Sequence, residues 1–332
     1  MNVKKNLLDA LAEAKGGYIS GAALAERIGV SRNAVWKAVK SLEADGYSIE
    51  SVTAKGYRLS SDNNRLSAEV ISADITAESL GCKVIVLDEV DSTNNYAKKL
   101  AAQGALHGTV VAAERQTGGK GRLGRSFSSP KGTGLYMSVI IRPECSVETA
   151  SLITSAVSVA AAEAVEELCG GRVDIKWVND LYINGRKICG ILTEASLGME
   201  MKSLDYAVIG IGINVRSVKD IFDTELLQRA TSIEDETGNI ISRNRLCAEV
   251  INRLEIVLSQ LESRSYLAEY RRRELLTGHD ITASVGGETI TAKATGIDDN
   301  ANLVVRTEDG RERHLGSGEA NLCRIADAAH RK

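Results

Sequence analysis

The chain has 332 residues, of which 43% are hydrophobic, 26% are charged and only two are proline. This composition is typical of a folded globular protein, and the length predicts about two or three domains. No uncharged apolar run is long enough to span a membrane. A signal peptide needs an uninterrupted apolar stretch near the N-terminus, and here charged residues interrupt it. We therefore expect a cytoplasmic protein with no membrane partner. The six cysteines form no C-x-x-C pair, which argues against a disulfide framework or a zinc site.

The net charge of −3 is distributed unevenly. Residues 1–60 hold nine Lys/Arg and six Asp/Glu, so this segment carries +3 and the remainder of the chain carries −6. A small basic module at the N-terminus indicates an anionic partner for that module alone.

The N-terminal module has the pattern of a helix-turn-helix. Residues 3–14, 22–28 and 32–42 each repeat apolar side chains at helical spacing. Ser20 and Ser31 directly precede the second and third of these helices, where a serine commonly caps the first turn. Polar residues at the start of such a third helix usually contact base edges in DNA.

Residues 47–52 and 57–59 predict two short strands that would form a wing beside these helices. We therefore expect residues 1–62 to form a winged helix-turn-helix that binds DNA, with residues 60–65 as a polar linker. A small helical packing or dimerisation domain is the alternative. The predicted DNA-contacting residues lie at the start of the third helix and in the wing: Ser31, Arg32, Asn33, Lys37, Lys40 and Lys55.

From Leu66 to about Arg273, strand-like and helical patterns alternate as in a mixed α/β domain. Strands are predicted at 84–87, 109–113, 134–141, 173–177, 187–194 and 206–215, and helices at 94–103 and 147–168. The strand at 206–215 is almost wholly apolar, which favours a central position in the sheet.

The C-terminal segment has a different pattern. Short strands are predicted at 281–285, 289–296, 303–307 and 312–315, and Gly- and Asp-rich turns separate them. We expect residues 278–326 to form a small β barrel.

The segment from Gly118 to Arg125 alternates four glycines with three cations directly after the strand at 109–113. Glycine lets the backbone approach a ligand closely, and lysine and arginine bind carboxylate or phosphate. The segment fits G-x-G-x-x-G, but residues 126–134 cannot form the helix that a dinucleotide site needs. It is not a Walker A loop either, because Glu114 stands at the leading glycine position. We expect an anion-binding loop of another kind, with a solvated basic loop as the alternative.

Five segments occur in the order and spacing of the biotin protein ligases: 91–94, 116–125, 176–182, 185–192 and 210–214. Together with the N-terminal module, the whole chain resembles a bifunctional biotin ligase and biotin-operon repressor. The resemblance implies an α+β catalytic domain with a mixed sheet over residues 66–275, followed by an SH3-like barrel. It also implies ATP and biotin as substrates, Mg²⁺ as the activating ion, and a biotin carboxyl carrier protein as the acceptor. Repression would act at operator DNA of biotin genes, through a homodimer that forms with biotinyl-5′-AMP bound.

The resemblance also implies roles for individual residues. Biotin would be bound by Ser92, Thr93, Asn94, Gln116, Lys120, Gly121, Arg122 and Lys187. The nucleotide would be bound by Arg122, Arg125, Asn179, Asp180 and Asn214. Arg122, Lys187 and Asp180 are the expected catalytic residues. The reaction requires the enzyme to hold two anionic substrates together, and it requires no nucleophile from the enzyme. Asp180 would either bind Mg²⁺ with the triphosphate or accept a proton from the carrier lysine, and both alternatives are open.

Three positions depart from the family pattern. Lys120 stands at a usual arginine and lacks its bidentate fork, and Val178 stands at a usual proline. The segment 216–238 has no tryptophan to close over the adenine, so Phe222 and Leu226 are expected to pack there instead. A lipoate-type ligase and a non-catalytic repressor that senses a small molecule are the two rival functions.

Overall fold

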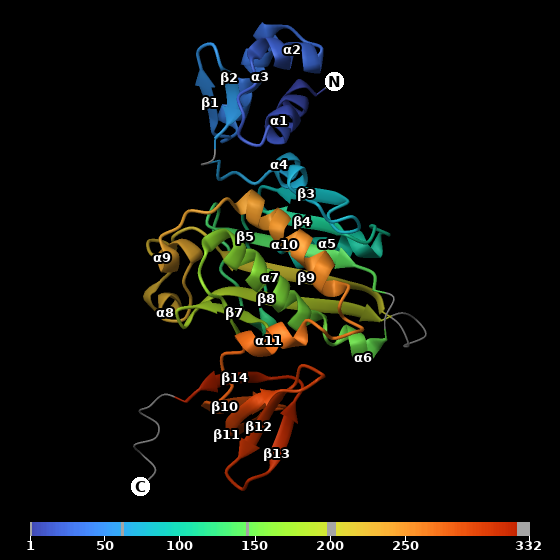
Figure 1. Ribbon diagram of the computed structural model, residues 1–332, viewed down its shortest axis with the longest axis vertical. Helices are drawn as coiled ribbons and strands as arrows, with labels where there is room; N and C mark the ends of the chain where they lie inside the picture. The colour runs from blue at the N-terminus through green and yellow to red at the C-terminus, as the bar shows by residue number, and fades with distance from the viewer. Residues whose placement is uncertain (1, 61–62, 144–145, 198–203, 324–332) are drawn as a thin grey trace.

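The computed structural model describes residues 2–60, 63–143, 146–197 and 204–323. In Figure 1 the N-terminal module lies at one end of the long axis, a large mixed sheet with its helices lies in the middle, and the C-terminal strands lie at the other end. Residues 61–62 of the predicted first domain and 324–326 of the predicted third lie outside the described residues.

The N-terminal module has the elements of a winged helix-turn-helix, as predicted. They are α1 Val3–Glu13, α2 Gly21–Ile28, α3 Arg32–Ala44, β1 Ile49–Val52 and β2 Gly56–Leu59. The hydroxyl oxygens of Ser20 and Ser31 accept hydrogen bonds from the third residue beyond each, so both serines cap their helices. Gly29 ends α2 at φ +72°, a left-handed conformation that glycine adopts without steric cost. Apolar residues from all three helices and from β2 form the core of this module, and Val70 of the central part packs against it.

The central part contains a seven-stranded sheet in the order β3-β4-β5-β9-β8-β7-β6. Its strands are β3 Lys83–Leu87, β4 Thr109–Ala113, β5 Gly134–Ile141, β6 Asp174–Lys176, β7 Asp180–Ile183, β8 Arg186–Leu197 and β9 Leu204–Asn214. β3 and β4 are parallel and the other neighbours are antiparallel, so the sheet is mixed. β9 is the middle strand, which confirms the position predicted from its apolar sequence.

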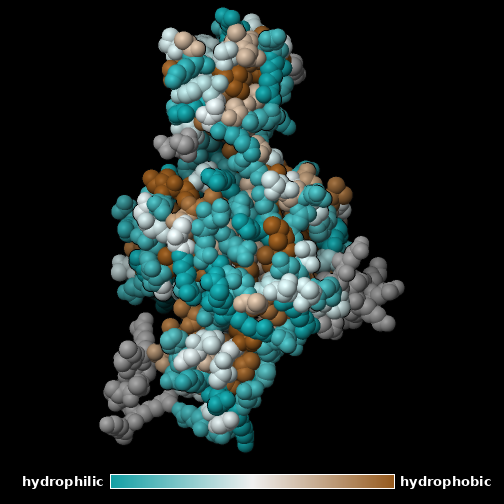
Figure 2. Space-filling view, viewed as in Figure 1, coloured by the Kyte–Doolittle hydropathy of each residue, from teal (hydrophilic) through white to brown (hydrophobic). Residues whose placement is uncertain are grey.

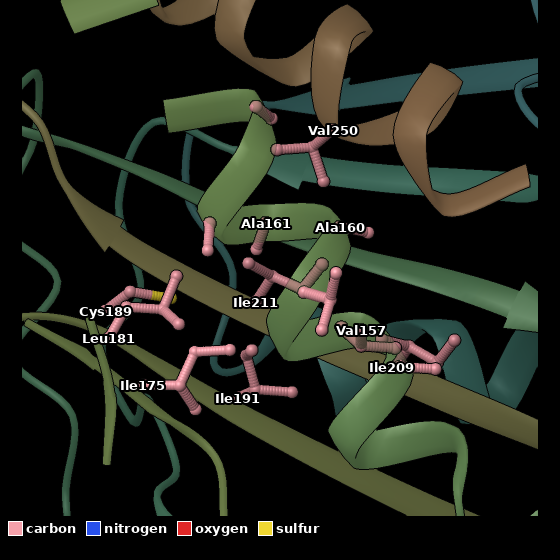
Figure 3. Packing of buried hydrophobic residues seen from close by; sticks show 14 of the residues in the cluster. Val157, Ala160, Ala161, Ile175, Leu181, Cys189, Ile191, Ile209, Ile211 and Val250 are labelled. Carbon is pink, nitrogen blue, oxygen red and sulfur yellow. The ribbon is translucent and has the colours of Figure 1, made fainter. Parts of the chain in front are cut away.

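Helices cover both faces of this sheet. The helices of the central part are α4 Ala68–Ala73, α5 Thr93–Ala102, α6 Val147–Ala150, α7 Ile153–Cys169, α8 Thr224–Leu227, α9 Ile233–Thr237, α10 Arg243–Leu258 and α11 Leu267–Arg273. Figure 3 shows Val157 and Ala161 of α7 packed between Val250 of α10 and the isoleucines of β9. Neighbouring residues of a strand point to opposite faces, and Val208 of β9 accordingly packs under α5.

The predicted single helix over 147–168 is wrong, because the chain forms two helices with a turn at residues 151–152. Leu152 N donates to Thr149 O at 3.0 Å, and the Leu152 side chain is 1% exposed. The Ser155 hydroxyl bonds Leu152 O at 2.8 Å and lies 2.8 Å from Tyr266 OH. The Tyr266 hydroxyl also donates to Leu152 O at 3.3 Å, so a distant part of the chain holds this turn, and that partner is not visible in local sequence.

The C-terminal part is an antiparallel sheet in the order β13-β12-β11-β10-β14. Its strands are β10 Asp280–Val285, β11 Glu288–Ile297, β12 Leu303–Thr307, β13 Glu312–Leu315 and β14 Glu319–Leu322. The first four agree with the predicted strands, whereas β14 was not predicted. In the described part of the chain no helix is both long and apolar enough to cross a membrane. Figure 2 shows hydrophobic residues in separate patches on the visible face.

A buried ion pair attaches the linker to the central sheet. Arg243 Nη2 lies 2.8 Å from Glu114 Oε2, and the two side chains are 1% and 4% exposed. The guanidinium also donates to Gly134 O at 3.0 Å and to both oxygens of Asn64. Glu114 Oε1 accepts from Leu66 N at 2.6 Å. The chain that leaves the N-terminal module is therefore bonded to the end of β4 and the start of β5.

We predict that Arg243→Met lowers the free energy of unfolding of the central part by about 3–5 kcal/mol, because Glu114 would stay buried without its partner. Urea unfolding followed by the fluorescence of Trp177, which is 3% exposed, measures the change. Arg253→Met is the matched control, since its ion pairs lie near the surface and such pairs contribute roughly 0–1 kcal/mol. Equal losses in the two variants would contradict the role of the buried pair.

Candidate functional site

A cleft lies where the glycine-rich loop, the strands β7, β8 and β9, and the β13–β14 turn meet. All predicted ligand-site residues except Asn214 line it: Ser92, Thr93, Asn94, Gln116, Lys120, Gly121, Arg122, Arg125, Asn179, Asp180 and Lys187. The tertiary structure thus gathers predicted residues that are up to 95 positions apart in the chain, from Ser92 to Lys187.

Asn214 lies at the end of β9 and is 4% exposed, but it does not line the cleft. Its Nδ2 donates to Thr231 O at 2.9 Å, so it joins β9 to the following segment. Phe222 is buried against Val218 and Ala230, and neither Phe222 nor Leu226 lines the cleft. Asn214, Phe222 and Leu226 are thus outside the lining of the cleft, and their contacts with a nucleotide stay predictions.

One wall of the cleft consists of neutral hydrogen-bonding groups. Gln116 Oε1 accepts from Thr93 N at 2.8 Å and from Thr93 Oγ1 at 3.1 Å, while its Nε2 donates to Ser129 Oγ at 2.8 Å. Ser92 caps α5 by accepting from Asn95 N at 3.4 Å and also lines the cleft. These amide and hydroxyl groups can both donate to and accept from a neutral polar ligand.

Asn94 is fixed below this wall by contacts on three sides. Its Oδ1 lies 2.6 Å from Ser138 Oγ, and its Nδ2 donates to Glu194 Oε2 at 2.9 Å. Gly210 of β9 makes the position possible, because a Cβ there would lie 2.2 Å from Asn94 Oδ1. Burial favours a raised pKa for Glu194, but hydrogen bonds from Lys98 and Asn94 outweigh it and hold the pKa below its ordinary value.

Phe127 forms an apolar wall that the sequence analysis missed. Its ring lies over Gly212 of β9, where a Cβ would come within 2.6 Å of it, and near Gly190 of β8. The ring also meets Tyr136 edge-on, with centroids 6.4 Å apart. Phe127 is one of only two phenylalanines in the chain and lies two residues after the glycine-rich segment. This position is the feature of the sequence that could have indicated its role. The wall supplies the apolar surface that ligand pockets commonly need.

Arg122 projects from a single 3₁₀ turn, Arg122–Gly124, at the tip of the glycine-rich loop. Its Nη1 donates to Asn179 Oδ1 at 2.9 Å and its Nη2 to Gly318 O at 3.0 Å. Asn179 is held in turn by Nδ2 donating to Ile191 O at 2.6 Å. Both partners of the guanidinium are neutral oxygens, so its charge stays available to an anion.

Lys187 and Asp180 form an ion pair across the hairpin of β7 and β8, with 2.7 Å between Lys187 Nζ and Asp180 Oδ1. The hairpin has a two-residue loop: Ile183 pairs with Arg186, and Asn184 and Gly185 between them have φ of +51° and +75°. Two left-handed residues in a two-residue loop match the turn that Asn-Gly favours.

The C-terminal sheet contributes to the cleft, which the sequence analysis did not foresee. Arg125 donates to both oxygens of Glu319, at 2.8 and 2.6 Å, and this contact is the main reason that the pKa of Glu319 is lowered. Lys176 donates to Asn321 Oδ1 at 2.6 Å, and Trp177 Nε1 donates to Ala301 O at 3.1 Å. The Trp177–Val178 peptide, at the usual proline position, is cis.

The lining residues carry five cations and two carboxylates. The cations are Lys120, Arg122, Arg125, Lys176 and Lys187, and the carboxylates are Asp180 and Glu319. Lys120 donates to Asn95 Oδ1 at 2.9 Å, so Lys120, Arg122 and Lys176 all have hydrogen bonds to neutral oxygens. Burial, the largest effect, lowers the pKa of Lys176. The cleft therefore has excess positive charge that suits a ligand with more than one anionic group.

The carboxylates of the cleft do not form a metal cage. In the described residues no group of three or more His, Cys, Asp or Glu side chains is arranged to hold a metal ion. Asp180 alone fits a Mg²⁺ ion of the kind that is held mostly by substrate phosphates and one or two carboxylates.

The predicted DNA-contacting residues lie on the N-terminal module. Ser31 caps α3, and Arg32, Asn33, Lys37 and Lys40 are exposed along that helix. Lys55 is exposed in the turn of the wing, 5.8 Å from the Tyr18 ring centroid. The four α3 side chains share one face, since the residues between them, such as Val35 and Val39, are buried.

The chain matches three family models in turn. Residues 3–58 match the HTH domain, residues 86–214 match the Biotin/lipoate A/B protein ligase family, and residues 278–322 match the Biotin protein ligase C terminal domain.

Whole-chain comparisons agree with these matches. The chain is 35% identical over 316 residues to the Bifunctional ligase/repressor BirA of Bacillus subtilis, covering 93% of this chain and 95% of that one. It is 31% identical to the protein of the same name from Escherichia coli, covering 93% and 94%. Its structure is similar to the biotin protein ligase from Aquifex aeolicus in complex with biotin and ATP, with a TM-score of 0.62, 29% identity, and coverage of 73% of this chain and 99% of that one. The chain belongs to the biotin/lipoate A/B protein ligase family.

Proposed function

We propose that the chain is a biotin protein ligase that joins biotin to ATP and then transfers the biotinyl group to a lysine of a biotin carboxyl carrier protein. The observation that carries the proposal is the group of three cations in the cleft, Lys120, Arg122 and Lys176, whose hydrogen bonds go to neutral oxygens. The neutral polar wall and Phe127 supply the rest of a biotin pocket. The names and ligands of the similar proteins support the same activity.

Biotin has three parts that the cleft can bind separately. The ureido ring would exchange hydrogen bonds with Ser92, Thr93 and Gln116, which form the neutral wall. The bicyclic body would lie on Phe127 and the glycines beneath it. The carboxylate would then face Arg122, where its charge replaces neutral oxygens as the partner of the guanidinium.

In the first step a carboxylate oxygen of biotin attacks the α-phosphorus of ATP. The new O–P bond gives biotinyl-5′-AMP, and the bond to the leaving pyrophosphate breaks. Two anions repel each other on approach, so catalysis here consists of holding both and stabilising the charge at phosphorus. Arg122 and Lys187 would bridge carboxylate and phosphate oxygens, and Arg125 and Lys120 would add to the positive potential.

In the second step the amine of the carrier lysine attacks the acyl carbon, AMP leaves, and the amine loses a proton. Asp180 is the carboxylate that lies beside Lys187. If the adenylate draws Lys187 away, Asp180 is free to accept this proton. Mg²⁺ would enter with ATP and offset phosphate charge, and Asp180 is the residue that fits it in the first step.

The direct test is exchange of labelled pyrophosphate into ATP by the purified protein with Mg²⁺. Exchange that requires biotin, and that lipoate does not support, is expected. Exchange with lipoate alone would favour the lipoate-type rival, and exchange with neither acid would leave the cleft as a sensor of a small anion.

We also propose that the N-terminal module makes the protein a biotin-responsive repressor of biotin genes. The exposed basic face of α3 and Lys55 of the wing suit the phosphates of operator DNA. Biotinyl-5′-AMP in the cleft would favour a homodimer, which would present two α3 helices to a two-fold operator.

Arg122→Gly is expected to weaken retention of biotinyl-5′-AMP by about 10- to 100-fold, since a hydrogen bond to a charged group contributes roughly 1.5–3 kcal/mol. The released adenylate would biotinylate lysines of a bystander protein such as albumin, and gel filtration of the labelled adenylate would measure retention. Arg115→Gly is the control, because Arg115 is exposed, pairs with Glu89 and does not line the cleft. Unchanged retention in Arg122→Gly would refute the assigned contact.

Lys187→Met is expected to reduce the rate of pyrophosphate exchange by about 10²- to 10³-fold, because it removes a donor to developing charge. Asp180→Asn should slow exchange too, since Asp180 orients Lys187. The double variant should lose less than the sum, with a coupling of about 0.5–3 kcal/mol. A cycle of Lys187→Met with Glu89→Gln, which lies outside the cleft, should be additive. Additive losses in the cycle of Lys187→Met with Asp180→Asn would show that these two residues act independently, and would contradict the orienting role of Asp180.

Biotin with ATP is expected to raise affinity for a duplex selected from a random DNA pool by about 5- to 150-fold, the usual range of coupling between sites. ATP alone should leave the affinity unchanged, because no adenylate forms. Fluorescence anisotropy of the labelled duplex measures affinity, and sedimentation measures dimer formation under the same conditions. Equal affinity in all conditions would rule out biotin-responsive binding.

A further inference from the structure

Helix α3 presents one large apolar side chain to solvent. Trp36 is 50% exposed, whereas Trp177, the other tryptophan, is 3% exposed and has its Nε1 bonded to Ala301 O. Trp36 is not among the residues that pack on the core of the N-terminal module. Tryptophan is enriched at binding surfaces because its rigid ring buries a large area with little loss of conformational entropy.

The surroundings of Trp36 indicate its partner. Arg32, Asn33 and Lys40 are exposed one turn before or after Trp36 on α3, and Lys37 is exposed directly after it. The stretch from Ser31 to Lys40 holds three cations and no acid, and Glu43 beyond it pairs with Lys40 at 2.7 Å. An aromatic ring among cations suits the major groove of duplex DNA, where phosphates flank the base edges.

We propose that Trp36 is a specificity-determining residue of α3 that contacts the methyl group of a thymine in the major groove. The inference rests on the DNA-binding part of the proposed function. The thymine methyl is the apolar group that base pairs expose there, and the indole offers it an apolar surface. Contacts between lysine and phosphate do not depend on the base sequence. Recognition of specific bases must therefore come from the other exposed residues of α3.

Asn33 extends the argument to a neighbouring base pair. An asparagine amide can bond adenine with two hydrogen bonds, and Asn33 is exposed three residues before Trp36. Three helical residues rise about 4.5 Å, which lies between one and two of the ~3.4 Å steps between base pairs. Asn33 and Trp36 would thus recognise neighbouring A·T pairs within two steps, one through adenine and the other through the thymine methyl.

The test starts from a duplex selected by the wild-type protein with biotin and ATP from a random pool. Each thymine is then replaced by deoxyuridine, which lacks only the methyl group. Wild-type affinity should fall about tenfold at one thymine of each half-site, within the range of a single mismatch. Trp36→Ala should bind the parent duplex about tenfold more weakly and be insensitive to that same replacement.

Lys37→Gln is the matched control from the same exposed face. It should weaken binding to all sequences alike and lower the salt-dependence slope by about one, whereas Trp36→Ala should leave the slope unchanged. In the wild-type protein the bound duplex should also shield Trp36 from iodide quenching, while the buried Trp177 contributes a constant background. Pyrophosphate exchange in each variant checks that the rest of the chain is intact.

The outcomes separate the inference from the proposed function. Enrichment of a duplex that Trp36→Ala binds as well as the wild type does would overturn the inference and leave DNA binding in place. A loss of affinity in Trp36→Ala with no thymine sensitive to deoxyuridine would overturn the methyl contact. Failure to enrich any duplex would refute both the DNA-binding function and the inference.

Discussion

The buried ion pair between Arg243 and Glu114 constrains the rest of the molecule. Neither charge can stay buried without the other, so the helix, strand and linker that hold them must meet at one point. Glu114 also accepts a hydrogen bond from Leu66 N, at the start of the central part. Gln116, two residues after Glu114 in the chain, is part of the polar wall of the cleft. The same contact therefore positions the N-terminal module and the base of the ligand-binding loop.

The cleft shows how a protein can hold several cations together before an anionic ligand arrives. Two of the five cations are paired with carboxylates, Lys187 with Asp180 and Arg125 with Glu319. The others are bonded to neutral oxygens, which orient them without cancelling their charge. A ligand with carboxylate and phosphate groups would replace these neutral oxygens with anionic oxygens, which form stronger hydrogen bonds with the cations. Contributions from the C-terminal sheet make this arrangement depend on how that sheet packs against the central part.

Much of the fold followed from local patterns. The N-terminal helices, their serine caps and the wing were predicted, because caps and apolar spacing act within a few residues. The central place of β9 followed from its apolar sequence. The division of 147–168 into two helices did not follow, since the bond between Ser155 and Tyr266 joins residues 111 positions apart. The other elements that were not predicted are helices α4, α8, α9, α10 and α11 and strands β7 and β14.

For the site, the sequence by itself determined the chemistry: glycines for close backbone approach, cations for anions, and motif spacing that indicates the family. Only the tertiary structure decided which of these residues meet. It brought Glu319 and Gly318 to Arg125 and Arg122, placed Phe127 over Gly212, and bonded Asn214 to Thr231 O. The physical reason is that these contacts join residues far apart in the chain. They depend on how the elements pack against one another, which local sequence patterns do not specify.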